Sequence, residues 1–211
     1  MDDLQFEVVL ASGSPRRRQL LEEAGVPFSV QVADVDETLE PDLVAQPTEA
    51  VKKLAERKAH AVVERLLVDG YEGALIVLGS DTMVALDNRI FGKPEDAADA
   101  KRMLESLSGR THQVHTAVSV WMIHAPAPEE GDISLGYRTF VDTTHVTFRE
   151  LAEEDIAAYI ASGDPFDKAG AYGIQSGAGV FVESIDGSLD TVIGFPVERL
   201  LREFPDIPRA R

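Results

Sequence analysis

Residues 12–18, Ser-Gly-Ser-Pro-Arg-Arg-Arg, have the side chains needed to bind an anion. They open a predicted helix, because Ser14 can cap a first turn and Pro15 suits that turn. Free backbone N–H groups and the helix dipole favour negative charge there, and guanidinium groups pair well with phosphate. Arg17 falls on the apolar side of the helical wheel, so we expect it to face inward and Arg18 to face solvent. An exposed arginine-rich turn is the alternative, and the glycine spacing is not that of a P-loop.

Two lysines could contact the same kind of ligand. In a predicted helix over residues 47–68, apolar residues recur at helical spacing, and Lys58 lies in the middle of that apolar face. A lysine there either extends its ammonium group to the rim or points into a polar cavity, and the sequence leaves both open. Lys93 precedes Pro94 at the start of another predicted helix, a position suited to a phosphate group.

Two acidic segments could supply a catalytic base or bind a divalent cation. Residues 79–82, Gly-Ser-Asp-Thr, separate two apolar runs, so we expect Asp81 at the end of a buried strand, where open α/β sheets place ligand groups. A carboxylate there could activate a water molecule or bind a metal ion. The acids of residues 34–38, among them Glu37, could give one more carboxylate to the metal. For both segments the alternative is a solvated turn or loop.

The composition argues against several other classes of protein. The 211 residues contain no cysteine, which excludes disulfides, thiolate metal sites and cysteine nucleophiles. A formal net charge of −17 argues against binding to nucleic-acid polymers or anionic membranes. The N-terminus is acidic, unlike a signal peptide, and no apolar run approaches the roughly 20 residues of a membrane helix. We therefore expect a cytoplasmic protein. Neither a dinucleotide fingerprint nor a histidine metal pattern is found.

Predicted strands and helices alternate along the chain, which indicates an α/β fold. Short runs of apolar or β-branched residues predict strands at residues 6–11, 28–33, 75–78, 83–86 and 180–185. Two longer runs predict a hairpin with arms at residues 114–123 and 138–148 and a loose tip at residues 125–136. Apolar residues at helical spacing predict helices at residues 15–24, 47–68, 94–107, 151–161 and 197–204. We expect the tail after Pro205 to be loose.

Seven motifs occur in order at residues 10–21, 36–38, 57–59, 79–84, 92–94, 107–114 and 167–175. Together they resemble the Maf family of nucleotide pyrophosphatases over nearly the whole chain. The resemblance implies a Maf/inosine-triphosphatase-like α/β fold, in which a mixed sheet and two lobes surround a central nucleotide-binding cleft within one domain over residues 1–211. It also implies hydrolysis of a nucleoside triphosphate to the monophosphate and pyrophosphate. A divalent cation (Mg²⁺, Mn²⁺ or Co²⁺) and a homodimer are further implications.

The same resemblance implies roles for individual residues. Asp81 is then the general base, and Glu37 and Asp81 hold the divalent cation, with Lys58 beside them in the catalytic group. Arg17, Lys58 and Lys93 would bind the triphosphate, with Lys168 a weaker candidate, and Ser12 would also contact the substrate. The side chains that would select the nucleobase are Arg16, Thr82 and Gln175.

These last three residues also indicate a branch of the family. Arg16, Thr82 and Gln175 resemble the branch that acts on dTTP, UTP and modified pyrimidine nucleotides in a house-cleaning role. A branch that acts on 7-methyl-GTP has a bulky aromatic residue in place of Arg16 and a glutamate in place of Gln175. A side-chain amide can pair with a pyrimidine edge as both donor and acceptor. The alternatives are the 7-methyl-GTP branch and a nucleotide-binding regulator of septum formation with little turnover.

Overall fold

Seven strands form one mixed sheet in the computed structural model, which describes residues 6–127, 129 and 131–210. The strand order is β2-β1-β3-β5-β6-β7, and β4 pairs with β3. β1 runs parallel to β2 and β3, whereas the other pairs are antiparallel. The strands are β1 Glu7–Leu10, β2 Ser29–Val30, β3 Gly73–Leu86, β4 Arg89–Phe91, β5 Thr111–Ala125, β6 Ser134–Phe148 and β7 Val182–Asp186. The α/β class with a mixed sheet is thereby confirmed.

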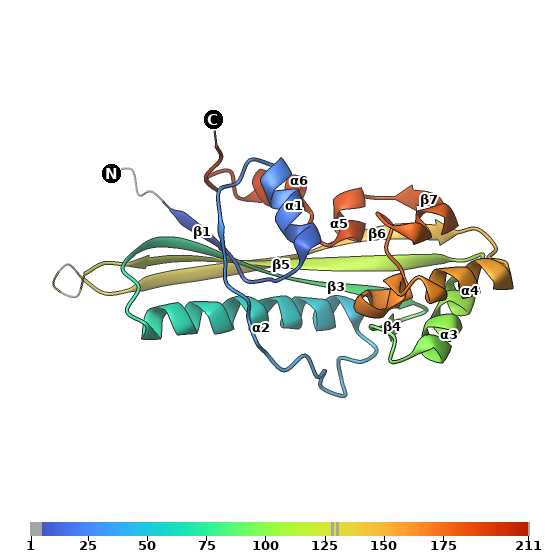
Figure 1. The fold of residues 1–211 in the computed structure, drawn as a ribbon. Coiled ribbons are helices and arrows are strands. Elements are labelled where there is room, and N and C mark those ends of the chain that lie inside the picture. Colours follow the sequence, from blue (N-terminus) through green and yellow to red (C-terminus); the bar gives the residue numbers. More distant parts are fainter. Residues whose placement is uncertain (1–5, 128, 130, 211) are drawn as a thin grey trace.

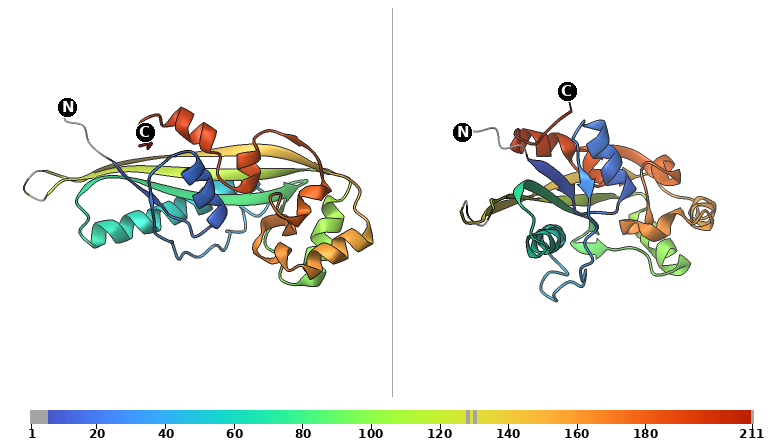
Figure 2. Two further views of the ribbon diagram at one scale, coloured as in Figure 1. Left: turned by 45° about the horizontal axis from the view of Figure 1, so that its top comes forward. Right: turned by 60° about the vertical axis from the view of Figure 1, so that its left-hand side comes forward.

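Helices cover both faces of this sheet (Figures 1 and 2). One face carries α1 Pro15–Glu23, α5 Leu189–Ile193 and α6 Val197–Glu203. The other face carries α2 Pro47–Val68, with α3 Ala97–Leu107 and α4 Glu153–Ala161 towards one end. Side chains alternate along β3, so Ile76 and Leu78 pack in the core beneath α1 and α6, while Leu75 and Val77 pack beneath α2.

Local sequence accounts for the ends of several elements. Ser14 accepts a hydrogen bond from the Arg17 N–H at the start of α1, and Asp96 caps α3 through the Asp99 N–H. Asp87 and Asn88 have φ values of 51° and 62°, the left-handed conformation that a two-residue hairpin between β3 and β4 requires.

β3 is one continuous strand of 14 residues, although the sequence predicted two strands separated by residues 79–82. The prediction was wrong because β5 pairs with β3 from Gly73 to Ala85 and keeps the polar segment within the ladder. The Ser80 hydroxyl is also satisfied, since it donates to the Gly194 carbonyl at 3.3 Å. A polar segment therefore crosses the centre of the sheet without interrupting it.

The hairpin and the tail also differ from their predictions. β5 and β6 pair as far as His124 and Ser134, so the tip is shorter than residues 125–136, and residues 128 and 130 lie outside the described part. The tail is not loose, because Ile207 is buried and the Ala210 N–H donates to the Gly25 carbonyl at 2.7 Å. The short elements β4 and α5 were not predicted. No helix in the described residues is both long and apolar enough to cross a membrane.

Candidate active site

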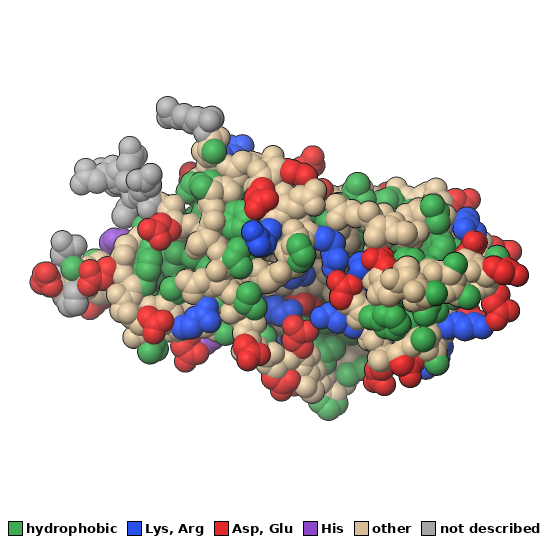
Figure 3. All heavy atoms as spheres, viewed as in Figure 1, with side chains coloured by type: hydrophobic (Ala, Val, Ile, Leu, Met, Phe, Trp, Pro, Cys, Tyr) green, Lys and Arg blue, Asp and Glu red, His purple; other side chains and the backbone are tan. Residues whose placement is uncertain are grey.

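A cavity of about 870 Å³ opens beside β3, and all ten predicted site residues line it. They are Ser12, Arg16, Arg17, Glu37, Lys58, Asp81, Thr82, Lys93, Lys168 and Gln175. Lysine and arginine side chains gather around this hollow in the middle of the face seen in Figure 3. The volume lies within the roughly 300–1,000 Å³ of small-molecule sites.

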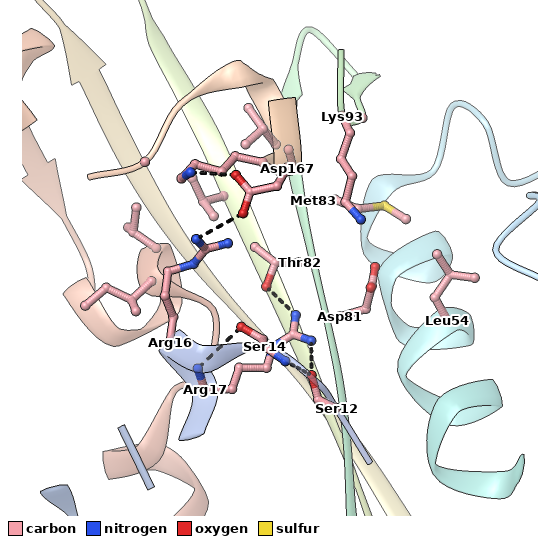
Figure 4. A pocket seen from close by; sticks show the side chains of 18 of the residues that line it. Ser12, Ser14, Arg16, Arg17, Leu54, Asp81, Thr82, Met83, Lys93 and Asp167 are labelled. Atoms are coloured by element: carbon pink, nitrogen blue, oxygen red, sulfur yellow. Dashed lines mark hydrogen bonds and ion pairs between the residues drawn. The ribbon is translucent and has the colours of Figure 1, made fainter. Parts of the chain in front are cut away.

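The Arg17 guanidinium is held by three separate acceptors at the start of α1, of which Figure 4 shows Ser12 and Thr82. Nε donates to the Gly194 carbonyl at 2.9 Å, Nη1 to Ser12 Oγ at 3.1 Å, and Nη2 to Thr82 Oγ1 at 3.2 Å. Burial lowers the pKa of Arg17 from its ordinary value, and the nearby Asp81 carboxylate opposes this change. The predicted inward direction of Arg17 is confirmed, and Arg18 is exposed as predicted. The three contacts of Arg17 fix its guanidinium group in one orientation within the cavity wall.

Lys58 joins two carboxylates from different parts of the chain. Its Nζ lies 2.6 Å from Asp81 Oδ1 on β3 and 2.8 Å from Glu37 Oε1 on the loop before α2. The Lys58 and Asp81 side chains are only 12% and 11% exposed, whereas the Glu37 side chain is 52% exposed. Of the two possibilities for a lysine on this apolar face, the structure therefore shows the polar cavity.

The short distance between Lys58 and Asp81 depends on Gly79. A Cβ atom added to Gly79 would lie 2.5 Å from the Ala55 carbonyl oxygen and 2.7 Å from Ala59 Cβ, both on α2. Only glycine lets the helix that carries Lys58 approach the strand that carries Asp81 this closely.

The sequence predicted Asp81 at the end of a strand. In the structure it lies within β3 instead. The last residue of β1 paired with β3 is Leu10, opposite Leu78, and β3 continues past that point because β5 still pairs with it. Asp81 therefore projects just beyond the carboxyl end of β1. This is the edge of the parallel part of the sheet, where α/β proteins place ligand groups.

The two carboxyl groups around Lys58 have opposite pKa shifts. Burial raises the pKa of Asp81 above its ordinary value, although Lys58 and Arg17 oppose the increase. Partial burial also favours a higher pKa for Glu37, but the hydrogen bond and charge of Lys58, with Lys93 and Arg17, hold it below its ordinary value. Glu37 is thus the more strongly acidic group, and Asp81 is the better proton acceptor of the pair.

The donor set around Lys58 suits a hard divalent cation that is shared with a phosphate ligand. Mg²⁺ prefers oxygen ligands and is commonly held by one or two carboxylates together with substrate phosphates. Glu37 and Asp81 supply two such carboxylates to one point of the cavity. Within the described residues, no cluster of three or more acidic or histidine side chains forms a complete protein cage.

The opposite wall of the cavity contains a network of acidic side chains. Lys168 Nζ donates to the Asp164 carbonyl at 2.6 Å, to Asp164 Oδ1 at 3.0 Å and to Asp167 Oδ1 at 2.6 Å. Asp167 Oδ2 also forms an ion pair with Arg16 Nη1 at 3.7 Å. Lys168 thus pairs with two carboxylates of its own segment. Lys93, which also lines the cavity, forms no ion pair with any described residue. Figure 4 shows Lys93 and Asp81 directed towards the same space.

Gln175 lies on a turn that Asp164 holds in place. Asp164 Oδ2 accepts hydrogen bonds from the Tyr159 and Ser176 hydroxyls, and the Tyr159 oxygen accepts one from the Gly173 N–H at 3.1 Å. Residues on both sides of Ile174 and Gln175 are thereby tied to α4 and to the short helical segment Asp164–Asp167. The Thr82 hydroxyl, in contrast, is already engaged in hydrogen bonds with Arg17 and Thr116.

Several supporting residues were missed by sequence reasoning. Asp164 and Tyr159 lie far from Arg16 in the sequence, and neither belongs to one of the seven motifs. Gly194 contributes only its carbonyl oxygen, so its residue type gives no signal of the contact with Arg17. Such contacts depend on tertiary packing and could not be found from residue types alone.

The geometry defines an α/β protein with acidic and basic side chains around a cavity of about 870 Å³. The family model described as "Maf-like protein" matches residues 7–207. The chain belongs to the Maf family.

Two relatives are named for the same activity. The chain is 46% identical over 197 residues to a dTTP/UTP pyrophosphatase of Bacillus cereus (strain AH187), covering 93% of both chains. It is 45% identical to a protein of the same name from Bacillus thuringiensis subsp. konkukian (strain 97-27), again covering 93% of both.

Solved structures show a more distant likeness. A HAM1 protein from Coxiella burnetii is 16% identical with a TM-score of 0.42, covering 96% of this chain and 100% of that one. A nucleoside-triphosphatase/dITP/XTP pyrophosphatase from Mycobacterium abscessus is 15% identical with a TM-score of 0.38, covering 95% and 94%.

Proposed function

We propose that this protein is a nucleoside triphosphate pyrophosphatase that hydrolyses dTTP and UTP to the nucleoside monophosphate and pyrophosphate. The observation that supports this most strongly is the buried Asp81 paired with Lys58 inside a cavity with cations on its walls. The names of relatives at 46% and 45% identity support the choice of dTTP and UTP.

We propose that the triphosphate lies against Arg17, Lys58 and Lys93. Arg17 is already fixed by Ser12 and Thr82, so it presents a pre-oriented charge to the ligand. Phosphate oxygens compete with Glu37 and Asp81 for the Lys58 ammonium. Lys168 has a lesser part, because its ammonium contacts Asp164 and Asp167.

Asp81 is proposed as the base that activates water. Its carboxylate accepts one proton from a water molecule while the water oxygen forms a bond to the α-phosphorus. The bond from the α-phosphorus to the bridging oxygen breaks, and that oxygen leaves with pyrophosphate. Burial raises the pKa of Asp81, which strengthens it as a proton acceptor near neutral pH. The cations around the cavity offset the negative charge that spreads over the phosphate oxygens.

Glu37 and Asp81 are the residues proposed to hold a divalent cation, and the family resemblance implies Mg²⁺, Mn²⁺ or Co²⁺. When bound, such a cation neutralises phosphate charge and helps orient the triphosphate. The carboxylates of Glu37 and Asp81 converge on one ammonium group, so they are close enough to share a ligand.

Arg16, Thr82 and Gln175 are proposed to select the nucleobase. The Gln175 amide offers one donor and one acceptor to the pyrimidine edge. Asp164 ties down the turn that contains Gln175, so the backbone that carries this side chain is held in place before the ligand arrives.

The test is a product assay with dTTP, UTP, CTP, ITP and 7-methyl-GTP in the presence of Mn²⁺. We expect pyrophosphate from dTTP and UTP, and loss of that product in the Asp81→Asn variant. Equal or faster turnover of 7-methyl-GTP would contradict the choice of substrate. Release of inorganic phosphate would indicate a phosphatase, and tight binding without turnover would indicate a regulator.

Three further features belong to the same proposal. A homodimer and a cytoplasmic location are proposed from the family resemblance and from the sequence. One domain with two lobes over residues 1–211 is also proposed. The continuity of the seven-stranded sheet supports the last of these.

A further inference from the structure

The loop that contains Glu37 needs an anchor of its own. Between β2 and α2 the chain has only turns and irregular structure, and the Glu37 side chain is 52% exposed. The contact with Lys58 fixes the end of that side chain, but it does not fix the backbone on either side. An exposed side chain on an unanchored loop loses conformational entropy when it must hold one position.

Arg57 supplies contacts to the backbone on both sides of Glu37. Its Nη1 donates to the Asp36 carbonyl at 3.2 Å and to the Thr38 carbonyl at 2.9 Å. Its Nη2 forms an ion pair with the Glu40 carboxylate. One guanidinium group therefore spans residues 36–40, with Glu37 inside the span.

The loop reinforces this arrangement with a local turn. Asp36 Oδ1 accepts a hydrogen bond from the Thr38 N–H at 2.8 Å, which keeps the two carbonyls that Arg57 contacts at a fixed separation. A planar guanidinium with several donors suits such a group of acceptors, whereas a lysine ammonium offers no comparable fork.

Arg57 and Lys58 are successive residues of α2 and act on different atoms of the same loop. Arg57 binds the backbone around Glu37, and Lys58 binds the Glu37 carboxylate. The helix thus defines both the path of the loop and the direction of its acidic side chain.

We propose that Arg57 is a positioning residue that holds the Glu37 carboxylate towards Asp81 and the triphosphate. The inference rests on the proposed function, because it assigns Arg57 a part in preparing the site for a metal–nucleotide ligand. Arg57 is not proposed to touch the substrate. Its whole effect passes through Glu37.

The matched control is Arg65, two turns further along the same helix. Its Nη2 donates to Gln31 Oε1 at 2.8 Å and its Nη1 to the Val32 carbonyl at 3.4 Å, so it contacts the beginning of the loop but not the neighbours of Glu37. Arg57→Gln and Arg65→Gln each remove one positive charge from the same face of α2. A difference between them therefore reports the particular contacts of Arg57.

The test is a double-mutant cycle with Arg57→Gln, Glu37→Gln and the combined variant. The first readout is Mn²⁺ affinity, measured by electron paramagnetic resonance with the non-cleavable analogue 2′-deoxyuridine 5′-(α,β-imido)triphosphate. We expect Arg57→Gln to weaken Mn²⁺ binding roughly 10–100-fold, as supporting residues of metal ligands do. We expect no further loss when it is added to Glu37→Gln, because its effect passes through that residue.

Hydrogen exchange is the second readout and needs neither metal nor nucleotide. We expect faster exchange over residues 34–46 in Arg57→Gln, unchanged exchange in α2, and smaller changes in Arg65→Gln. If Arg57→Gln lowers Mn²⁺ affinity equally in the wild-type and the Glu37→Gln background, the inference is overturned, even when wild-type protein cleaves dTTP. Failure of wild-type protein to release pyrophosphate, alongside the expected exchange pattern, would instead contradict the proposed function.

Discussion

Replacing Gly79 with alanine tests how closely α2 must approach β3. The new Cβ would lie 2.5 Å from the Ala55 carbonyl oxygen and 2.7 Å from the Ala59 backbone nitrogen. Ordinary contacts begin at 3.4 Å, so the helix must retreat by about 0.9 Å. Lys58 lies between these two contacts on α2, and Asp81 is two residues beyond Gly79. The substitution therefore separates the two members of the buried ion pair.

Two effects of the Gly79→Ala substitution can be sized. Overpacking of this kind costs roughly 1–3 kcal/mol, which lowers Tm by roughly 2–12 °C in a domain of this length. Displacement of a catalytic group by about 1 Å reduces kcat by up to about 100-fold. We expect the fall in kcat to exceed the rise in KM, because Arg17 and Lys93, which are also proposed to bind the triphosphate, are not on α2.

Calorimetry and pyrophosphate release from dTTP measure the two effects. Gly136→Ala is the control, since a Cβ added there meets no atom within 4 Å and the residue lies on the exposed part of β6. We expect that control to retain wild-type Tm and kcat. A Gly79→Ala variant with wild-type Tm and wild-type kcat would refute the argument that this close approach positions Lys58.

Four further predictions concern single side chains. Asp81→Asn should reduce kcat on the order of 10²–10⁴-fold with a small change in KM, measured by pyrophosphate release, and retained kcat would remove Asp81 as the base. Burial raises the pKa of Asp81 and the Lys58 charge lowers it, so kcat/KM should fall as pH drops through the pKa of Asp81. Lys58→Met removes the opposing charge and should move this acidic limb of the pH profile to higher pH. An acidic limb at the same pH in both proteins would contradict the influence of Lys58 on Asp81. Burial lowers the pKa of His112 to about 4, so the folded state keeps it neutral while the unfolded state is protonated below about pH 6.5. The contribution of neutral His112 to the free energy of unfolding is therefore complete above pH 6.5, and about 3 kcal/mol should be lost as pH falls towards 4. Urea unfolding at several pH values should show a weaker dependence of the free energy of unfolding on pH in His112→Gln. Asp164→Asn should loosen the turn that contains Gln175 and reduce the preference for UTP over CTP roughly 10-fold, which competition assays would detect as a changed kcat/KM ratio.

Local rules placed some of the cavity residues correctly, and the family resemblance supplied the others. The helical wheel indicated the direction of Arg17, and the apolar stripe of α2 marked Lys58 as unusual. Both inferences need only the period of a helix and a buried face. The alternation of predicted strands and helices gave the α/β class, and the family resemblance implied the grouping of the ten residues that line one cavity.

The features that could not be predicted depend on pairing between distant parts of the chain. Residues 79–82 appear to break a strand when only their polarity is considered, and only the pairing with β5 shows that β3 continues. The tail contains two prolines and charged residues, yet Ile207 is buried in the core beneath α1 and α6. In the same way, Asp164 gains its importance from Tyr159 and Ser176, which fold towards it.

The separate anchoring of the two loops around the cavity affects how this enzyme can change during evolution. The loop before α2 is fastened by Arg57 and Lys58, whereas the turn around Gln175 is fastened by Asp164. No hydrogen bond or ion pair among the described residues joins one loop to the other. On the proposed role of Gln175, mutations in the second loop would alter nucleobase preference while the phosphate chemistry is preserved. A scaffold with such independent parts can acquire new substrates through few mutations.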